Sequence, residues 1–248
     1  MNVVRSLLFN LLFWCWTAVV VFGFSPALLG PGRWSSRAQA VWAAGTDFLA
    51  RRVLGIRFEV RGRENLPEGA VIVASKHQSA YETIMFSLIL RDPAVVLKRE
   101  LLAIPLYGWY SRRMGMIPID RSASSKALRQ MMRAADKAAA QQRPILIFPE
   151  GTRVAPGVKG RYLPGVAGLY RHLGLPVVPV ALDSGLLWGR NALVKKPGTV
   201  TFQFLPAIPP GLDRAALMAR LETEIETASN ALLAGAGPVD NSGDQSRG

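Results

Sequence analysis

The sequence predicts an α/β fold with a mostly parallel or mixed central sheet flanked by helices, preceded by an apolar N-terminal segment. First, short apolar runs alternate with amphipathic stretches after residue 55, as in strands followed by helices. Second, 248 residues, 50% of them apolar, are enough for one main domain with a short appendage. Third, residues 1–54 lack this alternation and are apolar over much of their length.

Residues 1–54 are expected to anchor the chain to a membrane as a helix or helical hairpin. No charged residue occurs between Ser6 and Gly32, and residues 7–24 are almost wholly apolar. A helix needs about 20 apolar residues to span a bilayer, so this run is at the lower limit. The alternative is a hairpin in one leaflet, with residues 37–54 as its second arm. A cleaved signal peptide ending at Ala38-Gln39-Ala40 fits less well, because the apolar run is long and the site lies far from the start.

Basic residues indicate the orientation of this segment and the kind of surface it meets. Those that follow the apolar run outnumber Arg5 before it, so the positive-inside rule places the rest of the chain on the cytoplasmic side of the membrane, which we expect to be the inner membrane. The formal net charge of +13 in an apolar chain suits an anionic membrane or a phosphorylated lipid. Further basic residues could draw the protein onto such a surface, namely Arg112, Arg113, Arg190, Lys195 and Lys196.

The main domain is expected to cover residues 55–233. Apolar runs predict strands at 56–60, 71–75, 95–98, 116–119, 145–148, 177–182 and 200–205. Amphipathic stretches predict helices at 82–90, 124–142, 164–173 and 212–233. Residues 234–248 are rich in Gly, Ser and Asp, which predicts a disordered tail.

Metal and nucleic-acid sites are not expected. Cys15 is the single cysteine and His77 and His172 are the two histidines, which excludes a Cys-rich zinc site and makes a multi-histidine site improbable. His172 lies on a predicted helix away from the motifs and is expected to be structural. Nucleic-acid binding would need aromatic residues among the basic ones; here the aromatic residues cluster in the N-terminal segment.

The first motif that carries chemistry is Lys76-His77-Gln78-Ser79-Ala80-Tyr81-Glu82, between a predicted strand and a predicted helix. Sites in α/β sheets form at the carboxyl ends of strands. A carboxylate close to an imidazole can hold one ring nitrogen, which leaves the other to take a proton from a hydroxyl. The pattern therefore indicates an oriented base, although a lone histidine in a loop is more often structural.

Three more motifs follow. Phe148-Pro149-Glu150-Gly151-Thr152-Arg153 comes directly after a strand and offers a hydroxyl and a guanidinium, the donors that a phosphate needs. Glu150 could bind a ligand hydroxyl or stiffen the loop. A short predicted strand ends at Arg121, and a strand interrupted by proline covers residues 177–181.

The order and spacing of these four motifs resemble those of the glycerolipid acyltransferase superfamily, from about Val71 to Leu182. The block 148–153 is the most specific of them. The first block of that family is usually His, four residues, then Asp, and here Glu82 stands at the Asp position. Glutamate has the same charge and two acceptor oxygens, so the orienting role can survive the change.

The resemblance implies transfer of a fatty acyl chain from an acyl thioester to the sn-2 hydroxyl of lysophosphatidic acid. His77 would be the general base, assisted by Glu82. The substrate-binding residues would be Lys98, Arg121, Glu150, Gly151, Thr152 and Arg153. A backbone N–H near Val178 would stabilise the oxyanion. No resident cofactor is expected, because acyl-CoA or acyl carrier protein would serve as co-substrate.

Three rival functions remain open on the sequence. The first is the same acyl transfer to another lyso-lipid, such as a lyso-ornithine lipid, because arginine can hold a carboxylate as well as a phosphate. The second is a basic membrane-bound nucleic-acid-binding protein, and the third is a non-catalytic scaffold. The expected partners are a lyso-lipid, an acyl carrier and the membrane bilayer, with no nucleic acid.

Overall fold

The computed structural model describes residues 1–120 and 125–235, and a seven-stranded mixed sheet forms its centre. The strands are β1 (Ile56–Arg61), β2 (Ile72–Ser75), β3 (Ala94–Lys98), β4 (Ile117–Ile119), β5 (Ile145–Ile147), β6 (Val177–Leu182) and β7 (Gly198–Phe204). Their order across the sheet is β1-β7-β6-β2-β5-β3-β4. Neighbouring strands from β6 to β4 are parallel, whereas β7 is antiparallel to β6 and parallel to β1. The seven predicted strands and the mixed α/β fold are confirmed.

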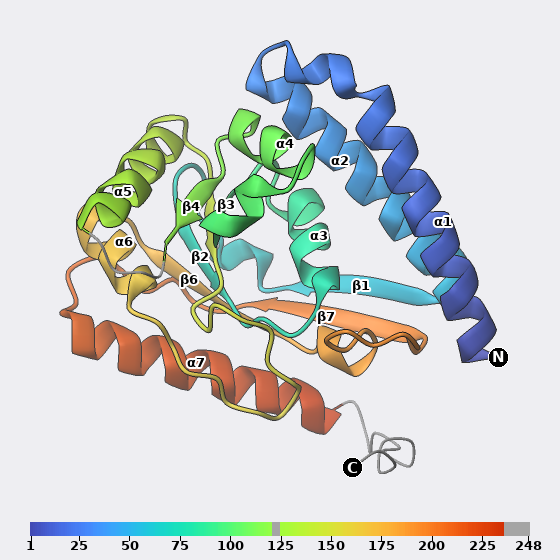
Figure 1. Ribbon diagram of the computed structural model, residues 1–248. Helices are drawn as coiled ribbons and strands as arrows, with labels where there is room; N and C mark the ends of the chain where they lie inside the picture. Colours follow the sequence, from blue (N-terminus) through green and yellow to red (C-terminus); the bar gives the residue numbers. More distant parts are fainter. Residues whose placement is uncertain (121–124, 236–248) are drawn as a thin grey trace.

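Helices cover both faces of the sheet (Figure 1). One face carries α1 (Asn2–Gly23), α2 (Gly32–Leu49), α3 (Ala80–Ile89) and α4 (Tyr107–Arg113). The other carries α5 (Ser125–Ala140), α6 (Gly165–Leu173) and α7 (Arg214–Gly235). The four predicted helices correspond to α3, α5, α6 and α7. Helix α4 was not predicted, because seven residues are too few for a helical period to stand out.

Alternating side chains of the central strands create two apolar cores. In β2, Val73 packs with α3 and the N-terminal helices, whereas Ile72 and Ala74 pack with the helices of the opposite face. Buried residues of α7 recur at helical spacing and close the second core, namely Leu217, Leu221 and Ile225. The period of two in a strand therefore explains why a central strand can be apolar throughout.

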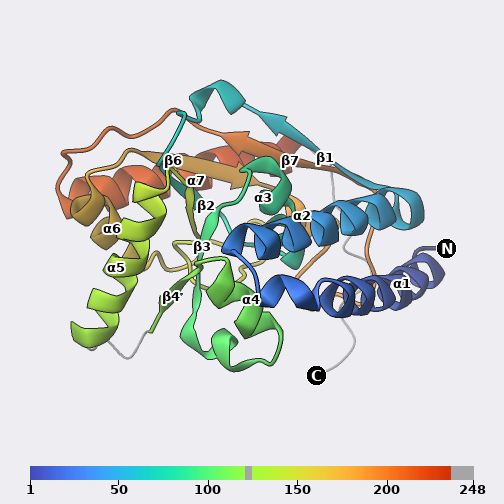
Figure 2. The same cartoon turned by 90° about the horizontal axis from the view of Figure 1, so that it is seen from above.

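Helices α1 and α2 form an antiparallel hairpin that lies against the main domain (Figure 2). The Trp16 indole donates to the Trp42 carbonyl at 3.0 Å, and the Trp42 indole donates to Thr17 Oγ1 at 2.9 Å. Phe9 of α1 is fully buried in the first core. The structure has the two arms of the alternative expectation, a hairpin, with the second arm α2 at Gly32–Leu49 rather than 37–54, and the first arm contributes directly to the core.

The C-terminal boundary differs slightly from expectation. The predicted helix 212–233 is observed as Arg214–Gly235, so the first two residues of the expected disordered tail belong to α7. The remainder of that tail, residues 236–248, lies outside the described residues. Elsewhere, the carboxyl ends of the parallel strands β2, β3, β5 and β6 meet at one edge of the sheet, and this edge carries the predicted motifs.

Candidate active site

His77 and Glu82 form a hydrogen-bonded pair at the carboxyl end of β2. His77 Nδ1 lies 2.8 Å from Glu82 Oε1. The His77 side chain is 17% exposed, whereas the Glu82 side chain is fully buried. A carboxylate accepts hydrogen bonds, so it favours the tautomer with the proton on Nδ1 and leaves Nε2 as an acceptor. The pair predicted from the first motif therefore has the geometry of an oriented base.

The same carboxylate caps helix α3. Ser79 is the N-cap residue, and its hydroxyl accepts from the Tyr81 N–H at 3.0 Å. Glu82, three residues later, accepts from the Ser79 N–H at 2.7 Å and the Gln78 N–H at 2.8 Å through Oε1. This reciprocal capping box uses glutamate at its third helical position. The structure thus gives a physical reason for a glutamate here, because one oxygen caps the helix and orients His77.

The second motif holds the backbone and ring of His77. Glu150 Oε2 accepts from the His77 N–H at 2.9 Å, and the His77 carbonyl accepts from the Val154 N–H at 2.8 Å. The Phe148 ring stacks on the imidazole, with centroids 4.1 Å apart and planes 24° apart. These contacts fix the plane of the imidazole independently of Glu82.

Glu150, which holds the His77 backbone, belongs to a buried cluster of ion-paired side chains. Its Oε1 pairs at 2.8 Å with Lys76 Nζ, which is also 2.7 Å from Glu226 Oε1 on α7. The Lys76 side chain is 1% exposed and donates a further bond to the Val158 carbonyl at 3.1 Å. The Tyr162 hydroxyl donates to Glu226 at 3.0 Å, and its pKa is raised by burial and by the nearby carboxylates. Both oxygens of Glu150 are thus bonded inside the protein, which favours the alternative expectation that Glu150 stiffens the loop over the expectation that it binds substrate.

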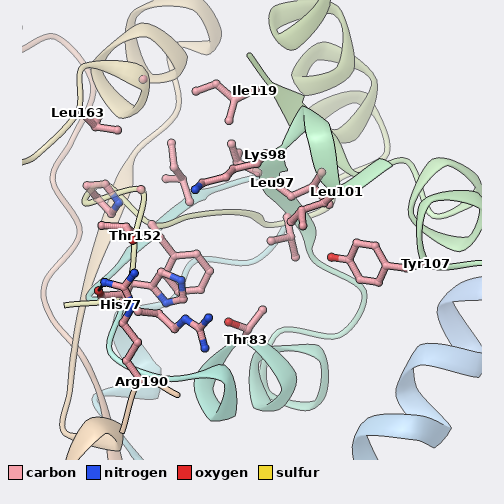
Figure 3. Close-up of a pocket in the computed structure, with 18 residues that line it drawn as sticks. His77, Thr83, Leu97, Lys98, Leu101, Tyr107, Ile119, Thr152, Leu163 and Arg190 are labelled. Carbon is pink, nitrogen blue, oxygen red and sulfur yellow. Dashed lines mark hydrogen bonds between the residues drawn. The ribbon is translucent and has the colours of Figure 1, made fainter. Parts of the chain in front are cut away.

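A pocket of about 340 Å³ opens beside His77 and contains most of the other predicted residues. Lys98 of β3, Gly151, Thr152 and Arg153 all line it, as expected from the motifs. Gly151 has φ +62°, a left-handed conformation that suits glycine and turns the loop toward the pocket. His77 and Thr152 lie at one end of the pocket and Tyr107 at the other, with Lys98 between them (Figure 3).

Other parts of the chain complete the pocket. Thr83 of α3, Tyr107 of α4 and Arg190 of the β6–β7 connection line it together with apolar residues. Ser184 lies outside the pocket but donates to Glu82 Oε2 at 2.7 Å. Thr83 directly follows Glu82, so the sequence alone could have indicated that Thr83 lies near the site. Nothing local distinguishes Tyr107 or Ser184, because only the folded chain brings them to this edge.

Four expectations about individual residues have different outcomes. Arg121 lies outside the described residues. Val178 is fully buried inside the sheet opposite Val73 of β2, and an oxyanion donor near it stays a prediction. Lys195 is buried rather than facing a lipid surface. His172 contacts Asp136 of α5 at 2.8 Å, which agrees with the structural role expected of it.

Comparisons with known proteins agree with the motifs. A family model described as Acyltransferase matches residues 57–183. The 1-acyl-sn-glycerol-3-phosphate acyltransferase of Pseudomonas aeruginosa is 37% identical over 198 residues, which are 80% of this chain and 77% of that protein. The human 1-acyl-sn-glycerol-3-phosphate acyltransferase beta is 32% identical over 173 residues, which are 68% of this chain and 62% of that protein.

A solved structure shares the fold. The 1-acyl-sn-glycerophosphate acyltransferase PlsC of Thermotoga maritima matches with a TM-score of 0.72 over 94% of this chain and 98% of that chain. Its sequence identity is 23%, so this similarity concerns the arrangement of helices and strands.

The buried role of Glu150 makes a prediction about stability. Glu150→Gln should lower the free energy of unfolding by about 3 kcal/mol, because it removes one partner of a buried ion pair while Glu226 stays with Lys76. Denaturant unfolding in detergent measures this. Glu222→Gln is the control, because Glu222 pairs with the exposed Lys159 and should matter little. An unfolding midpoint equal to that of the wild type would contradict the internal role of Glu150.

Proposed function

Because this chain belongs to the acyltransferase family, we propose that it transfers a fatty acyl chain from an acyl thioester to the sn-2 hydroxyl of lysophosphatidic acid. The observation that carries the proposal is the His77–Glu82 pair beside a pocket that also contains basic side chains. The product is phosphatidic acid, a precursor in phospholipid biosynthesis. The acyl thioester is carried by coenzyme A or by acyl carrier protein.

His77 acts as the general base in the proposed reaction. Glu82 holds Nδ1, so Nε2 takes the proton of the acceptor hydroxyl as its oxygen attacks the thioester carbonyl carbon. The tetrahedral intermediate then collapses, the C–S bond breaks, and the leaving thiolate receives the proton from His77. The products are an ester and a free thiol. This sequence forms no covalent enzyme intermediate and requires no resident cofactor or metal.

The acceptor phosphate binds at the cationic side of the pocket. Arg153, Lys98 and the Thr152 hydroxyl line it and supply charged and neutral donors for phosphate oxygens. Apolar residues also line the pocket, with Leu97 and Leu101 on the side of Tyr107 and Ile119 on another side (Figure 3). Such a pocket suits a molecule with one anionic and one hydrocarbon part.

The α1–α2 hairpin docks the protein onto the inner membrane, with the catalytic domain on the cytoplasmic face. Within the described residues, α1 is the helix long and apolar enough to cross a membrane. Large apolar side chains are exposed along the hairpin, including Leu7, Leu8, Leu11, Trp14, Val19, Phe22, Leu29, Trp34 and Phe48. Docking spares the lipid acceptor from leaving the bilayer, which costs about 0.8 kcal/mol per CH₂.

The direct test uses the purified protein, a labelled acyl thioester and a panel of lyso-lipids that includes lysophosphatidic acid and lyso-ornithine lipid. Lysophosphatidic acid should be the preferred acceptor. His77→Ala should lower turnover by about 10²–10⁴-fold, the usual contribution of a general base. His172→Ala, which removes the other histidine, should keep full activity. Near-normal turnover of the His77 variant would overturn the mechanism, and preference for lyso-ornithine lipid would overturn the acceptor.

Glu82 should affect the rate rather than acceptor binding. Glu82→Gln preserves the size of the side chain but removes the charge that stabilises the imidazolium, so kcat should fall by about 10²–10⁴-fold. The KM for lysophosphatidic acid should change little, because the buried carboxylate does not reach the substrate. Steady-state kinetics measures both constants. An unchanged kcat would mean that Glu82 does not assist the base.

Arg153 should affect acceptor binding rather than the rate. Arg153→Ala should raise the KM for lysophosphatidic acid about tenfold, since a charge-assisted bond to phosphate contributes about 1.5–3 kcal/mol. Arg153→Lys should recover only part of the loss, because it keeps the charge without the planar fork. Each substrate is varied while the other is saturating. A change in the donor KM alone would assign Arg153 to the acyl carrier instead.

A further inference from the structure

One connection in the chain contacts the catalytic pair, the pocket and the N-terminal helix in turn. Residues 184–195 lie between β6 and β7. At their start, Ser184 Oγ donates to Glu82 Oε2 at 2.7 Å, and the Gly185 N–H donates to the Gln78 side chain at 3.0 Å. Further along, Arg190 lines the pocket. At their end, Lys195 is bonded to α1. A displacement of this connection would therefore move side chains at the catalytic pair and in the pocket.

Lys195 fastens the end of the connection to α1. Its Nζ donates to Asn10 Oδ1 at 2.9 Å, and its backbone N–H donates to Ser6 Oγ at 2.9 Å. The ammonium also lies 4.9 Å from the centroid of the Trp188 ring and 5.6 Å from that of Phe9. The ammonium also donates to the Leu193 and Ala192 carbonyls of the connection itself, at 3.4 and 3.5 Å, so its partners are all neutral. Burial lowers the pKa of the ammonium. Burying the Lys195 ammonium costs solvation free energy, so we interpret its bonds to α1 as a contact that fixes the position of the connection.

Trp188, which also belongs to the β6–β7 connection, packs against α1 as well. The Trp188 ring packs edge-on against Phe9 of α1 with centroids 5.2 Å apart, and it lies 5.9 Å from the Tyr81 ring of α3. Arg190 therefore sits between two points, Trp188 and Lys195, that both contact α1. The segment that carries Arg190 is therefore held against α1 on both sides of Arg190.

The Arg190 side chain lies in the pocket beside the catalytic histidine. Its Nη1 donates to the Arg153 carbonyl at 3.2 Å, and the side chain is otherwise exposed. Figure 3 shows it beside His77 and Thr152, at the end of the pocket away from Tyr107. A guanidinium has five N–H donors in a planar fork, which matches two oxygens of a phosphate.

We propose that Arg190 binds the phosphate of the acceptor lipid and that the contact of Lys195 with α1 holds Arg190 in that position. The proposal rests on the function proposed above. Arg190 is a specificity residue that touches the acceptor, and Lys195 and Asn10 are positioning residues that act through it. Helix α1 thereby contributes to acceptor binding as well as to membrane docking.

A double-mutant cycle tests the proposal with the full-length protein in lipid vesicles. The variants are Arg190→Ala, Lys195→Met and the double variant, each assayed with lysophosphatidic acid varied at saturating donor. Arg190→Ala should raise the acceptor KM about tenfold, and Lys195→Met should raise it about threefold to tenfold. The double variant should resemble Arg190→Ala, because Lys195 has no effect once Arg190 is absent. The donor KM should stay constant throughout.

A second pair of variants approaches the contact from α1. Asn10→Ala removes the amide partner of Lys195 without altering the connection, and it should reproduce the rise in acceptor KM. Thr17→Val is the matched control, because Thr17 bonds α1 to Trp42 of α2 and does not contact the connection. It should leave the acceptor KM unchanged. This pair keeps the test decisive if Lys195→Met does not fold.

Several results would overturn the inference. Multiplicative effects of Lys195→Met and Arg190→Ala would show that Lys195 does not act through Arg190. A loss of stability in Lys195→Met and Asn10→Ala without a change in acceptor KM would show a merely structural contact. A normal acceptor KM for the Arg190→Ala variant would overturn this inference and leave the proposed acyltransferase function intact. If the wild type acylates no lyso-lipid, the proposed function itself fails.

Discussion

A buried carboxylate must have its oxygens satisfied by donors, and the way Glu82 meets this requirement organises the site. Oε1 faces His77 Nδ1 and the N–H groups of Gln78 and Ser79, while Oε2 accepts from the Ser184 hydroxyl. These donors come from the β2–α3 turn and from the start of the β6–β7 connection. One side chain therefore joins the helix cap, the imidazole and the β6–β7 connection, so that none of the three can shift alone.

A second set of contacts holds the backbone of His77. The Glu150 carboxylate holds its backbone N–H, and Lys76 links Glu150 to Glu226 of α7. The acidic residue of the second motif thus serves the protein interior, whereas Thr152 and Arg153 of the same motif line the pocket. A short motif can divide its residues between support and binding because successive positions in a loop face different sides. Arg153 consequently faces the pocket while Glu150 faces the interior.

The strands were predictable because central strands packed on both faces are continuous apolar runs, each bounded by turn residues. The pairing of His77 with Glu82 was predictable as well, since both lie within one strand–helix turn. The sequence could not show which way Glu150 faces, because its partners Lys76 and Glu226 are distant in the chain. The contributions of Tyr107 and Ser184 also depend on tertiary structure, as does the burial of Lys195 against α1.

The central claim is that Glu82 holds His77 as the Nδ1–H tautomer with Nε2 free to accept a proton. Nitrogen NMR of protein labelled with ¹⁵N-histidine observes this directly. The chain has two histidines, so a His172→Asn variant leaves a single imidazole signal from His77. At a pH where the ring is neutral, the account predicts a protonated Nδ1 and an unprotonated Nε2, and Glu82→Gln should shift this balance. A neutral ring protonated on Nε2 in the wild type would contradict the account.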